Sequence, residues 1–316
     1  MKKDCFYVFV EEMKIMIESP LNYTGGKYRL LPQILPHFPN DINRFVDIFC
    51  GGCNVGCNVE ADNIVFNDNN TTIISLFNVL RDNPKDETLL AIERIIKKYK
   101  LSNVNKNGYE FYSCKSGEGL ADYNRPYFNQ LRDDFNKRKR KDRYYYYMFY
   151  VLVVYAFNNQ IRFNSKGEYN LPVGKRDFNN QMRKKLTEFI DYIQNHEVLF
   201  TNLDFRRFEL NENTDFIYAD PPYLITCASY NENDGWNETM ERDLLEYLDQ
   251  ASDNGIRFAL SNVLRSKGKE NRILIDWINA NVHRYRVIEL DYGYGNSNYH
   301  TKDKTSKSEE VLIVNY

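Results

Sequence analysis

The chain has 316 residues, and its 42 basic and 44 acidic side chains leave a formal charge of −2 at neutral pH, which excludes a strong overall positive field. This length allows one large domain or two. The six cysteines are irregularly spaced, and the apolar stretch near the N-terminus ends at Glu11, too soon for a signal sequence or a membrane span, so we expect a soluble, cytoplasmic protein.

Short apolar runs alternate with helical patterns toward both ends of the chain. Strands are expected at 45–50, 64–68, 197–200, 216–219, 256–262, 286–290 and 310–316. Helices are expected at 71–82, 238–254 and 270–281, where apolar residues recur at helical spacing. This alternation predicts an α/β fold in which most strands of one sheet are parallel.

The middle of the chain has a different pattern. Pro84 opens a helical pattern, residues 101–123 are typical of a loop or hairpin, and RYYYYMFYVLVVYAF (143–157) is apolar all round, as a buried helix is. A Lys-Gly turn in FNSKGEYNLPVG (163–174) predicts a hairpin. We interpret residues 84–185 as a mainly helical insertion into the sheet domain. The remaining divisions are that sheet domain, residues 18–83 and 186–316, and an N-terminal extension, residues 1–17.

One local basic block interrupts the balanced charge. Residues 137–143 read KRKRKDR, so six of seven positions are Lys or Arg. A charge run is most often the solvated face of a helix. The alternative is contact with the phosphates of a nucleic acid.

The first expected strand runs directly into a glycine-containing turn, FVDIFCGGCNVG (45–56). Such a turn lets the backbone approach a ligand closely. Gly51 and Gly56 fit the dinucleotide fingerprint, but Cys53 stands at its second glycine position. Asp68, at the end of the second strand, is placed to bind ribose hydroxyls. Together these residues indicate an adenosine-containing cofactor, with a tight turn and a capping Asp as the structural alternative.

Two other interpretations of the glycine-rich segments are disfavoured. Cys50, Cys53 and Cys57 have no nearby fourth ligand, so we expect no metal site. NYTGGKY (22–28) lacks the first glycine of a phosphate loop and has tyrosine where that motif needs Ser or Thr. We interpret it as a flexible anion-binding turn in which Lys27 binds a carboxylate.

The stretch FIYADPPYL (216–224) places an acid, two prolines and a tyrosine at the end of a strand, where open α/β sheets bind ligands. The prolines have no N–H, so they do not compete for the Asp220 carboxylate, and fixed φ angles hold the Pro221 carbonyl in one direction. Two acceptors facing one spot suit the exocyclic amine of a planar base. Tyr223 supplies a ring on which that base can stack.

This arrangement suits methylation of an aromatic amine. Such a nitrogen is a poor nucleophile because its lone pair is delocalised into the ring. Two acceptors on its hydrogens favour a pyramidal nitrogen, and the carboxylate stabilises the positive charge that develops during attack. The electrophile would be a methyl group on a sulfonium, held in line with the nitrogen. The structural alternative is a strand that simply ends in a Pro-Pro turn.

These motifs resemble the Dam-like, D12-type DNA adenine-N6 methyltransferases over most of the chain, from about residue 20 to the end. Their order, NYTGGK, FVDIFCGG, FND, an inserted region and DPPY, is that of the alpha group. The resemblance implies a Rossmann-like methyltransferase sheet with an inserted, mainly helical target-recognition domain. It implies S-adenosyl-L-methionine as cofactor and site-specific methylation of a flipped-out adenine in double-stranded DNA, for restriction–modification or epigenetic marking.

The resemblance also assigns roles to individual residues. The cofactor-binding residues that it implies are Tyr23, Lys27, Asp47, Phe49, Gly51, Asp68, Asp204, Phe205 and Asp220. The catalytic residues that it implies are Asp220, Pro221 and Tyr223. The DNA-binding candidates are Arg162, Asn164, Lys137, Arg138, Lys139 and Arg140, with Lys267, Lys269, Lys302, Lys304 and Lys307 as further phosphate contacts. Arg162 is the candidate for reading a guanine edge, because a guanidinium donates two parallel hydrogen bonds.

The chain departs from the family pattern at Cys53, where the second glycine of the loop is usual, and at Ile48, where proline is usual. Two alternatives stay open: an N4-cytosine methyltransferase, which more often has serine at the position of Asp220, and a catalytically silent DNA-binding module. A nicotinamide oxidoreductase is disfavoured by Cys53 and by the lack of an evident hydride-site acid or base. We expect no metal and no membrane partner, and a monomer, with a dimer as the alternative. GATC is a common target in the family, but these residues do not determine the target sequence.

Overall fold

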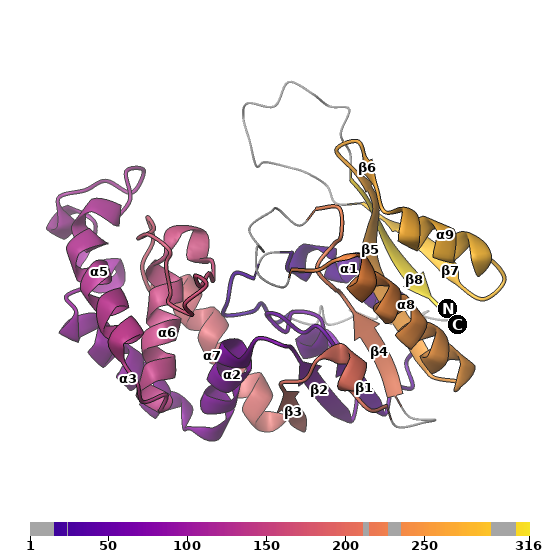
Figure 1. Ribbon diagram of the computed structural model, residues 1–316. Coiled ribbons are helices and arrows are strands. Elements are labelled where there is room, and N and C mark those ends of the chain that lie inside the picture. The colour runs from indigo at the N-terminus through magenta and orange to yellow at the C-terminus, as the bar shows by residue number, and fades with distance from the viewer. Residues whose placement is uncertain (1–15, 24, 211–214, 227–234, 292–307) are drawn as a thin grey trace, which may run out of the picture.

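The computed structural model describes residues 16–23, 25–210, 215–226, 235–291 and 308–316 (Figure 1). Its described strands form one eight-stranded sheet. They are β1 (Arg44–Asp47), β2 (Asn63–Asn67), β3 (Val198–Thr201), β4 (Asp215–Ala219), β5 (Arg257–Ser266), β6 (Lys269–Glu270), β7 (Arg286–Leu290) and β8 (Glu309–Val314). The seven strands expected from the sequence are confirmed, and only the short β6 is an addition.

The sheet is mostly parallel, as the strand–helix alternation predicted. Its order is β3-β2-β1-β4-β5-β8-β7, with β6 paired to β5. The five strands from β3 to β5 run parallel, whereas β8 is antiparallel to both β5 and β7. Because β1, β2 and β4 are adjacent and parallel, the segments that follow them emerge at one edge of the sheet.

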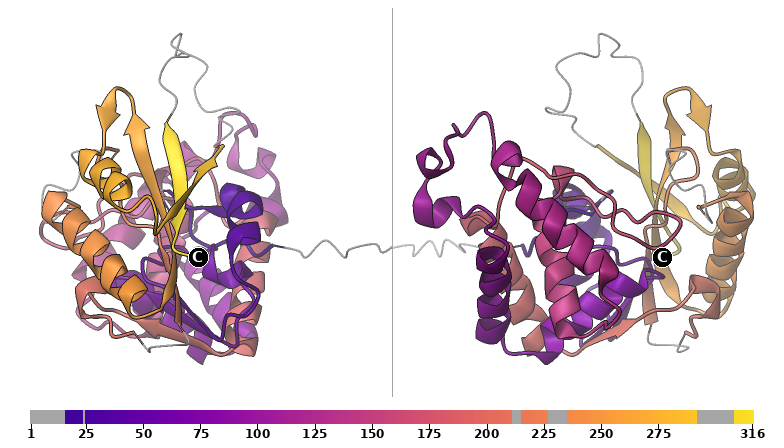
Figure 2. Two further views of the ribbon diagram at one scale, coloured as in Figure 1. Left: turned by 90° about the vertical axis from the view of Figure 1, so that its right-hand side faces the viewer. Right: turned by 60° about the vertical axis from the view of Figure 1, so that its left-hand side comes forward.

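Helices cover both faces of this sheet. The α-helices are α1 (Leu31–Ile34), α2 (Thr71–Asp82), α3 (Lys85–Lys98), α4 (Val104–Asn107), α5 (Ala121–Lys137), α6 (Arg143–Tyr155), α7 (Asn180–Asn195), α8 (Glu238–Asp253) and α9 (Arg272–Ala280). One apolar core joins the sheet to α1, α2, α6 and α7, and a second joins the opposite face to α8 and α9. Figure 2 shows α8 and α9, in orange, on one side of the sheet and the earlier helices, in indigo to magenta, on the other.

The middle of the chain is largely helical, and it lies beside the β3 end of the sheet in Figure 1. Residues Tyr147–Tyr155 of α6 are all buried, which confirms the expectation of a helix that is apolar all round. Helices α5 and α7 were not expected, because polar residues outnumber apolar ones in both. Residues 101–123 contain short helical turns rather than a hairpin.

The expected hairpin at 163–174 is present only in part. Phe163 and Tyr169 form an isolated antiparallel bridge, and a second bridge joins Ala156 to Val173. The basic block at 137–143 is not a helix face, because Lys137 ends α5 and the residues before Arg143 form the loop that leads into α6. Within the described residues, each helix is too short or too polar to span a membrane.

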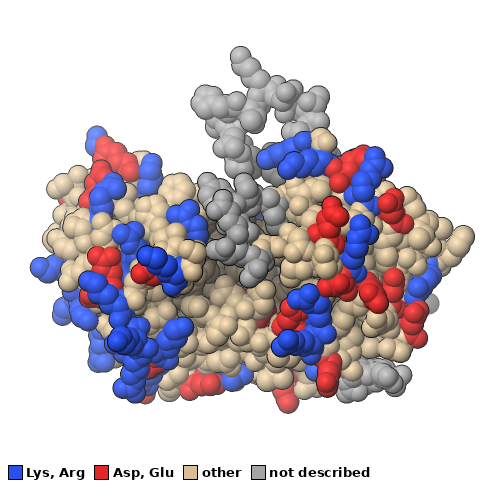
Figure 3. Space-filling model, in the orientation of Figure 1, with Lys and Arg blue, Asp and Glu red and all other residues tan. Residues whose placement is uncertain are grey.

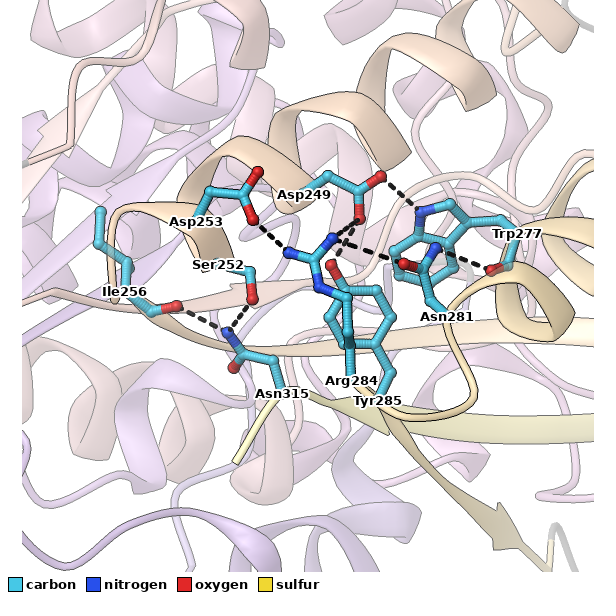
Figure 4. A network of polar contacts seen from close by, with 9 residues as sticks. All are labelled: Asp249, Ser252, Asp253, Ile256, Trp277, Asn281, Arg284, Tyr285 and Asn315. Carbon is cyan, nitrogen blue, oxygen red and sulfur yellow. Dashed lines mark hydrogen bonds and ion pairs between the residues drawn. The ribbon is translucent and has the colours of Figure 1, made fainter.

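A polar network ties α8 to the segments around α9 (Figure 4). Asp249 of α8 accepts hydrogen bonds from Trp277 Nε1 at 3.0 Å and from the Tyr285 hydroxyl. Arg284 forms an ion pair with Asp253, one helical turn further along α8. Donors and acceptors are matched in this network, which fixes the helices on the back of the sheet.

Candidate active site

Three of the predicted acids lie together at the carboxyl edge of the sheet. Asp47 ends β1, Asp68 directly follows β2 and Asp220 directly follows β4. The backbone of Ile48 donates to the Tyr218 carbonyl at 3.0 Å, which continues the β1–β4 pairing toward the loops. The glycine loop after β1 and the DPPY turn after β4 are therefore neighbours, as the sequence predicted.

The glycine loop is fixed by the Asp68 carboxylate and covered by the ring of Tyr23. Gly51 has a positive φ of 48°, and its N–H donates to Asp68 Oδ2 at 3.0 Å. A Cβ atom on Gly51 would come within 2.8 Å of the Tyr23 ring, so this position requires glycine. Asp68 Oδ1 accepts from the Asn70 N–H at 2.8 Å, but each carboxylate oxygen can accept a second hydrogen bond.

The loop accommodates Cys53 in a conformation that favours glycine. Its φ is 64°, in the left-handed region, and its side chain is fully buried within the apolar core. Its N–H donates to the Cys50 carbonyl at 2.6 Å. The departure from the family motif therefore changes the side chain but leaves a backbone shape typical of glycine.

Lys27 connects the TGGK segment to the DPPY turn. Its Nζ lies 2.8 Å from Asp220 Oδ2 and 3.5 Å from an oxygen of Glu310, on β8, and it donates to the Gly25 carbonyl at 2.9 Å. The Tyr223 hydroxyl lies 3.1 Å from Asp220 Oδ1 and 2.9 Å from Glu310 Oε1. The Lys27 ammonium and the Tyr223 hydroxyl are thus shared by the carboxylates of Asp220 and Glu310. The Lys27 side chain is only 3% exposed.

Burial and mutual repulsion shift the pKa of each group in this cluster. Burial raises the pKa of Asp220, and the nearby Lys27 opposes this rise. Burial also raises the pKa of Glu310, where Lys27 again opposes the rise and Asp220 adds to it. Burial alone would lower the pKa of Lys27, but the two carboxylates outweigh this effect and raise it.

Asp47 adds a further negative charge beside the cluster. Its Oδ1 is buried and has no hydrogen-bond partner among the described residues. Burial, followed by the charge of Asp220, raises the pKa of Asp47 well above its ordinary value. Among the described residues of this cluster, carboxyl groups outnumber the one cation, Lys27, which favours a positively charged ligand.

An aromatic wall lies on one side of the glycine loop. The ring centroid of Phe49 is 5.4 Å from that of Phe205 and 5.6 Å from that of Trp236. Asp204, the predicted partner of Phe205, caps the turn Phe205–Arg207 and pairs with Arg206 at 2.6 Å. The hydrogen bond from Arg206 lowers the pKa of Asp204, which keeps this carboxylate ionised.

Two residues of this site were missed from the sequence. Glu310 was included in the strand expected at 310–316, although an acid at the start of an otherwise apolar strand is itself a signal when it is buried, as Glu310 is in β8. Trp236 lies outside any periodic pattern, and no sequence signal connects it to Phe49. Trp236 is held by a hydrogen bond to Glu241, a fully buried acid that also accepts from Asn262.

The main DNA-binding candidates lie in the largely helical region of residues 84–185, apart from the carboxylate cluster. Arg162 is exposed and donates to Asn170 Oδ1 at 2.8 Å, whereas the Asn164 side chain closes the turn before Glu168. Lys137 and Asn164 line one cleft of about 520 Å³. Arg138 and Arg140 both pair with Asp142, and Lys139 is exposed. Lys267 lies in the turn between β5 and β6 and Lys269 begins β6, while Lys302, Lys304 and Lys307 lie outside the described residues.

A second and larger cleft, of about 940 Å³, lies between the TGGK segment and the helical region. Tyr23 and Gly25 line it from the TGGK segment, and Phe157, Lys175 and Arg176 line it from the helical region. In the face shown in Figure 3, Lys and Arg side chains predominate over the side of α3, α5 and α6, whereas acidic and basic groups alternate over the side of α8 and α9. No group of His, Cys, Asp or Glu suited to a metal ion occurs among the residues that the structure describes.

Comparison with known proteins matches the chain to one family and to several relatives. The model of the D12 class N6 adenine-specific DNA methyltransferases matches residues 23–292. "Modification methylase StsI" of Streptococcus sanguinis is 40% identical over 98% of this chain and 44% of its own length. "Type II methyltransferase M.FokI" of Planomicrobium okeanokoites is 38% identical over 95% of this chain and 43% of its own.

The chain therefore spans less than half the length of these two relatives. A "DNA adenine methylase" of Haemophilus influenzae is 29% identical over 64% of this chain and 63% of its own length. The family match covers most of the chain, including the Gly51 loop and the Asp220 turn. The chain belongs to the D12 class N6 adenine-specific DNA methyltransferase family.

Proposed function

We propose that the chain transfers the methyl group of S-adenosyl-L-methionine to the N6 amine of an adenine flipped out of duplex DNA. The observation that carries this proposal is the position of Asp220 and Tyr223 beside the glycine loop, at the carboxyl edge of the sheet. The relatives named as modification methylases and DNA adenine methylases support it. Their names also favour a role in restriction–modification.

The residues at this edge suit the cofactor. Asp68 would accept the ribose hydroxyls, Phe49 and Phe205 would flank the adenine ring, and Tyr23 and Lys27 would hold the methionine end. S-adenosyl-L-methionine would supply a methyl group on a positively charged sulfonium. The Asp47 oxygen, which accepts no hydrogen bond from the described part of the chain, and the excess of carboxylates there fit such a positive charge.

Asp220, Pro221 and Tyr223 would prepare the target amine. Asp220 and the Pro221 carbonyl accept the two amine hydrogens and favour a localised lone pair on the nitrogen. The carboxylate stabilises the positive charge that develops there, which requires Asp220 to be ionised. The Tyr223 ring offers a stacking surface that offsets part of the cost of flipping the base.

We further propose that residues 84–185 form the inserted target-recognition domain. Helices α3, α5 and α6 give this region its own helical layer, and the cleft lined by Lys175 and Arg176 opens toward the TGGK segment. Its boundary at residue 185 falls within α7, so this helix belongs to both parts. The basic loop before α6 would contact DNA phosphates, which position the protein without reading sequence.

Nucleoside analysis tests the proposed reaction against its two alternatives. The purified chain is incubated with S-adenosyl-L-methionine and DNA from a host that lacks adenine methylation, and the DNA is digested for mass spectrometry. We expect N6-methyldeoxyadenosine. N4-methyldeoxycytidine would instead identify a cytosine methyltransferase, and DNA binding without any modified nucleoside would identify a silent module. Long-read sequencing of the same DNA then gives the recognition site.

Arg162 is proposed to read a guanine edge within that site. The substitution Arg162→Ala should relax sequence choice at one base pair, because one bidentate pair contributes about 1–3 kcal/mol of discrimination. The measurement is the rate of methylation of DNA carrying each single-base change. Arg125→Ala, which removes an exposed arginine of α5 paired only with Asp122 among the contacts described, is the matched control. Unchanged selectivity in Arg162→Ala would remove it from the recognition set.

A further inference from the structure

The Lys27 ammonium lies on the oxygen that the proposed reaction needs. Asp220 has two oxygens, and each already contacts a donor: Oδ2 is 2.8 Å from Lys27 Nζ, and Oδ1 is 3.1 Å from the Tyr223 hydroxyl. A charged ammonium is a stronger donor than a neutral amine. Adenine would therefore have to compete with Lys27 for Asp220, unless Lys27 has another acidic partner within reach.

Glu310 is such a partner. Its Oε1 lies 2.9 Å from the Tyr223 hydroxyl and 3.5 Å from Lys27 Nζ. A shift of Lys27 Nζ by less than 1 Å would give it hydrogen-bond distance to Glu310. The same carboxylate can then hold both donors that Asp220 releases.

We propose that Glu310 is a positioning residue that takes over Lys27 and Tyr223 while Asp220 accepts the adenine amine. This inference rests on the proposed function, since it concerns the same reaction. Glu310 acts through Lys27 and Tyr223 and does not contact the base. It keeps the buried ammonium close to a carboxylate of the protein while Asp220 binds the amine, because an unpaired charge in such a site would be costly.

Among the described carboxylates, Glu310 is the one placed to take over Lys27 and Tyr223 from Asp220. Tyr218 also lies close to the cluster, but its hydroxyl is bonded to Ser261 Oγ at 2.8 Å. Asp47 influences Lys27 only electrostatically, and no hydrogen bond or ion pair joins them among the described contacts. Glu310 is 7% exposed and enters from β8, on the side of Asp220 opposite to β1 in the strand order.

Substitution of Glu310 separates this role from simple packing. Glu310→Gln keeps the shape and an acceptor for Tyr223 but removes the charge that attracts Lys27. We expect the single-turnover rate of methylation to fall about 10- to 100-fold, while the dissociation constant for S-adenosyl-L-methionine changes less than about threefold. Glu310→Asp, which keeps the charge, should recover most of the rate. Glu309→Gln removes the exposed neighbouring acid, which pairs with Arg265, and should match the wild type.

If Glu310→Gln alone does not fold, the role of the Glu310 charge can be tested in a variant that also lacks Lys27. Removing both partners of a buried ion pair is better tolerated than removing one. Lys27→Met takes away the competing ammonium, so adding Glu310→Gln to it should slow methylation by less than about threefold relative to Lys27→Met. A further loss of tenfold or more would overturn the inference.

The remaining outcomes are equally decisive. A Glu310→Gln rate within threefold of the wild type, or a Glu310→Asp rate as low as that of Glu310→Gln, would show that the Glu310 charge has no part in freeing Asp220. An equal loss of cofactor affinity and rate would assign Glu310 to cofactor binding instead. If the wild-type chain methylates no DNA, the proposed function fails, whereas methylation that is insensitive to Glu310 overturns only this inference.

Discussion

Two polar clusters on this sheet use similar side chains but differ in how their charges are matched. At the back, Asp249 accepts a hydrogen bond on each oxygen, and Arg284 pairs with Asp253 and, at 4.0 Å, with Asp249 (Figure 4). At the carboxyl edge, Lys27 is shared by Asp220 and Glu310, and Asp47 has an oxygen without a hydrogen-bond partner among the described residues. The first cluster is internally satisfied, and the second is left with excess negative charge.

This difference separates a structural network from a site prepared for a ligand. A matched network stabilises the native fold, because its donors and acceptors lose no hydrogen bond on burial. A buried excess of one charge costs stability, and such a cost is retained where it contributes to binding or catalysis. Substitutions in the two clusters should therefore have opposite consequences for stability and activity.

The largest effect is expected at Asp220. Asp220→Ala removes the carboxylate that would stabilise positive charge on the amine, so methylation should fall by at least about 10²–10³-fold. DNA binding should be largely retained, because phosphate contacts lie elsewhere. The measurements are the single-turnover rate and the dissociation constant for DNA of the folded variant. Loss of DNA binding in step with activity would refute the catalytic role.

At the back of the sheet, Asp249→Ala should affect stability and spare activity. It leaves the Trp277 and Tyr285 donors without their acceptor, so the free energy of unfolding should fall by about 1–3 kcal/mol. Asp253→Ala is the matched control: its exposed ion pair with Arg284 should contribute at most about 1 kcal/mol. Denaturant unfolding gives the two values, and the methylation rate at 25 °C should stay unchanged. Equal destabilisation by both variants would contradict the distinction between the clusters.

A stabilising substitution is expected in the carboxylate cluster. Asp47→Asn removes a buried charge that Asp220 repels, and should raise the free energy of unfolding by about 1 kcal/mol at pH 8. Because the folded-state pKa of Asp47 is raised, its contribution to stability is fully present below its ordinary pKa and is lost as pH rises through the folded value. The advantage of Asp47→Asn should thus grow with pH. The affinity for the cofactor should fall. A free energy of unfolding at high pH that is lower in Asp47→Asn than in the wild type would contradict this prediction.

Asp41→Asn provides the opposite pH dependence as a control. Asp41 is exposed, and its hydrogen bond with Arg257 lowers its pKa. Its contribution to stability is present above its ordinary pKa and is lost as pH falls through the lowered value. At neutral pH, Asp41→Asn should therefore be less stable than the wild type, whereas Asp47→Asn should be more stable. Both differences should shrink toward acid pH.

The sequence predicted the sheet well, because its strands are short apolar runs with distinct boundaries. All seven expected strands are present, and most of them are parallel, as the alternation of strands and helices predicted. Helices α5 and α7 were missed because each has a wide polar face, and a single stripe of buried residues such as Phe128 and Leu131 secures α5. Tertiary packing, rather than local periodicity, determines these two helices.

The common edge of the site was predictable from the acids that end or directly follow strands. Asp68 and Asp220 directly follow β2 and β4, the two strands that flank β1, so the topology brings them to the same edge of the sheet. Glu310 and Trp236 reach the same edge from β8 and from the segment before α8, and their positions depend on sheet order and side-chain packing. A single sequence contains no spacing rule for such contacts.

The smallest effect is expected at Cys53, where two contributions oppose each other. Cys53→Gly relieves a left-handed backbone conformation, which costs a non-glycine residue about 1–2 kcal/mol, but it removes a fully buried side chain of similar value. Stability should therefore change by less than about 1 kcal/mol. Cys57→Gly removes the same buried side chain at a residue without a positive φ, so it lacks the relief and should destabilise by about 1–3 kcal/mol. Denaturant unfolding of the two variants decides the point, and equal losses would show that the strain at Cys53 is negligible.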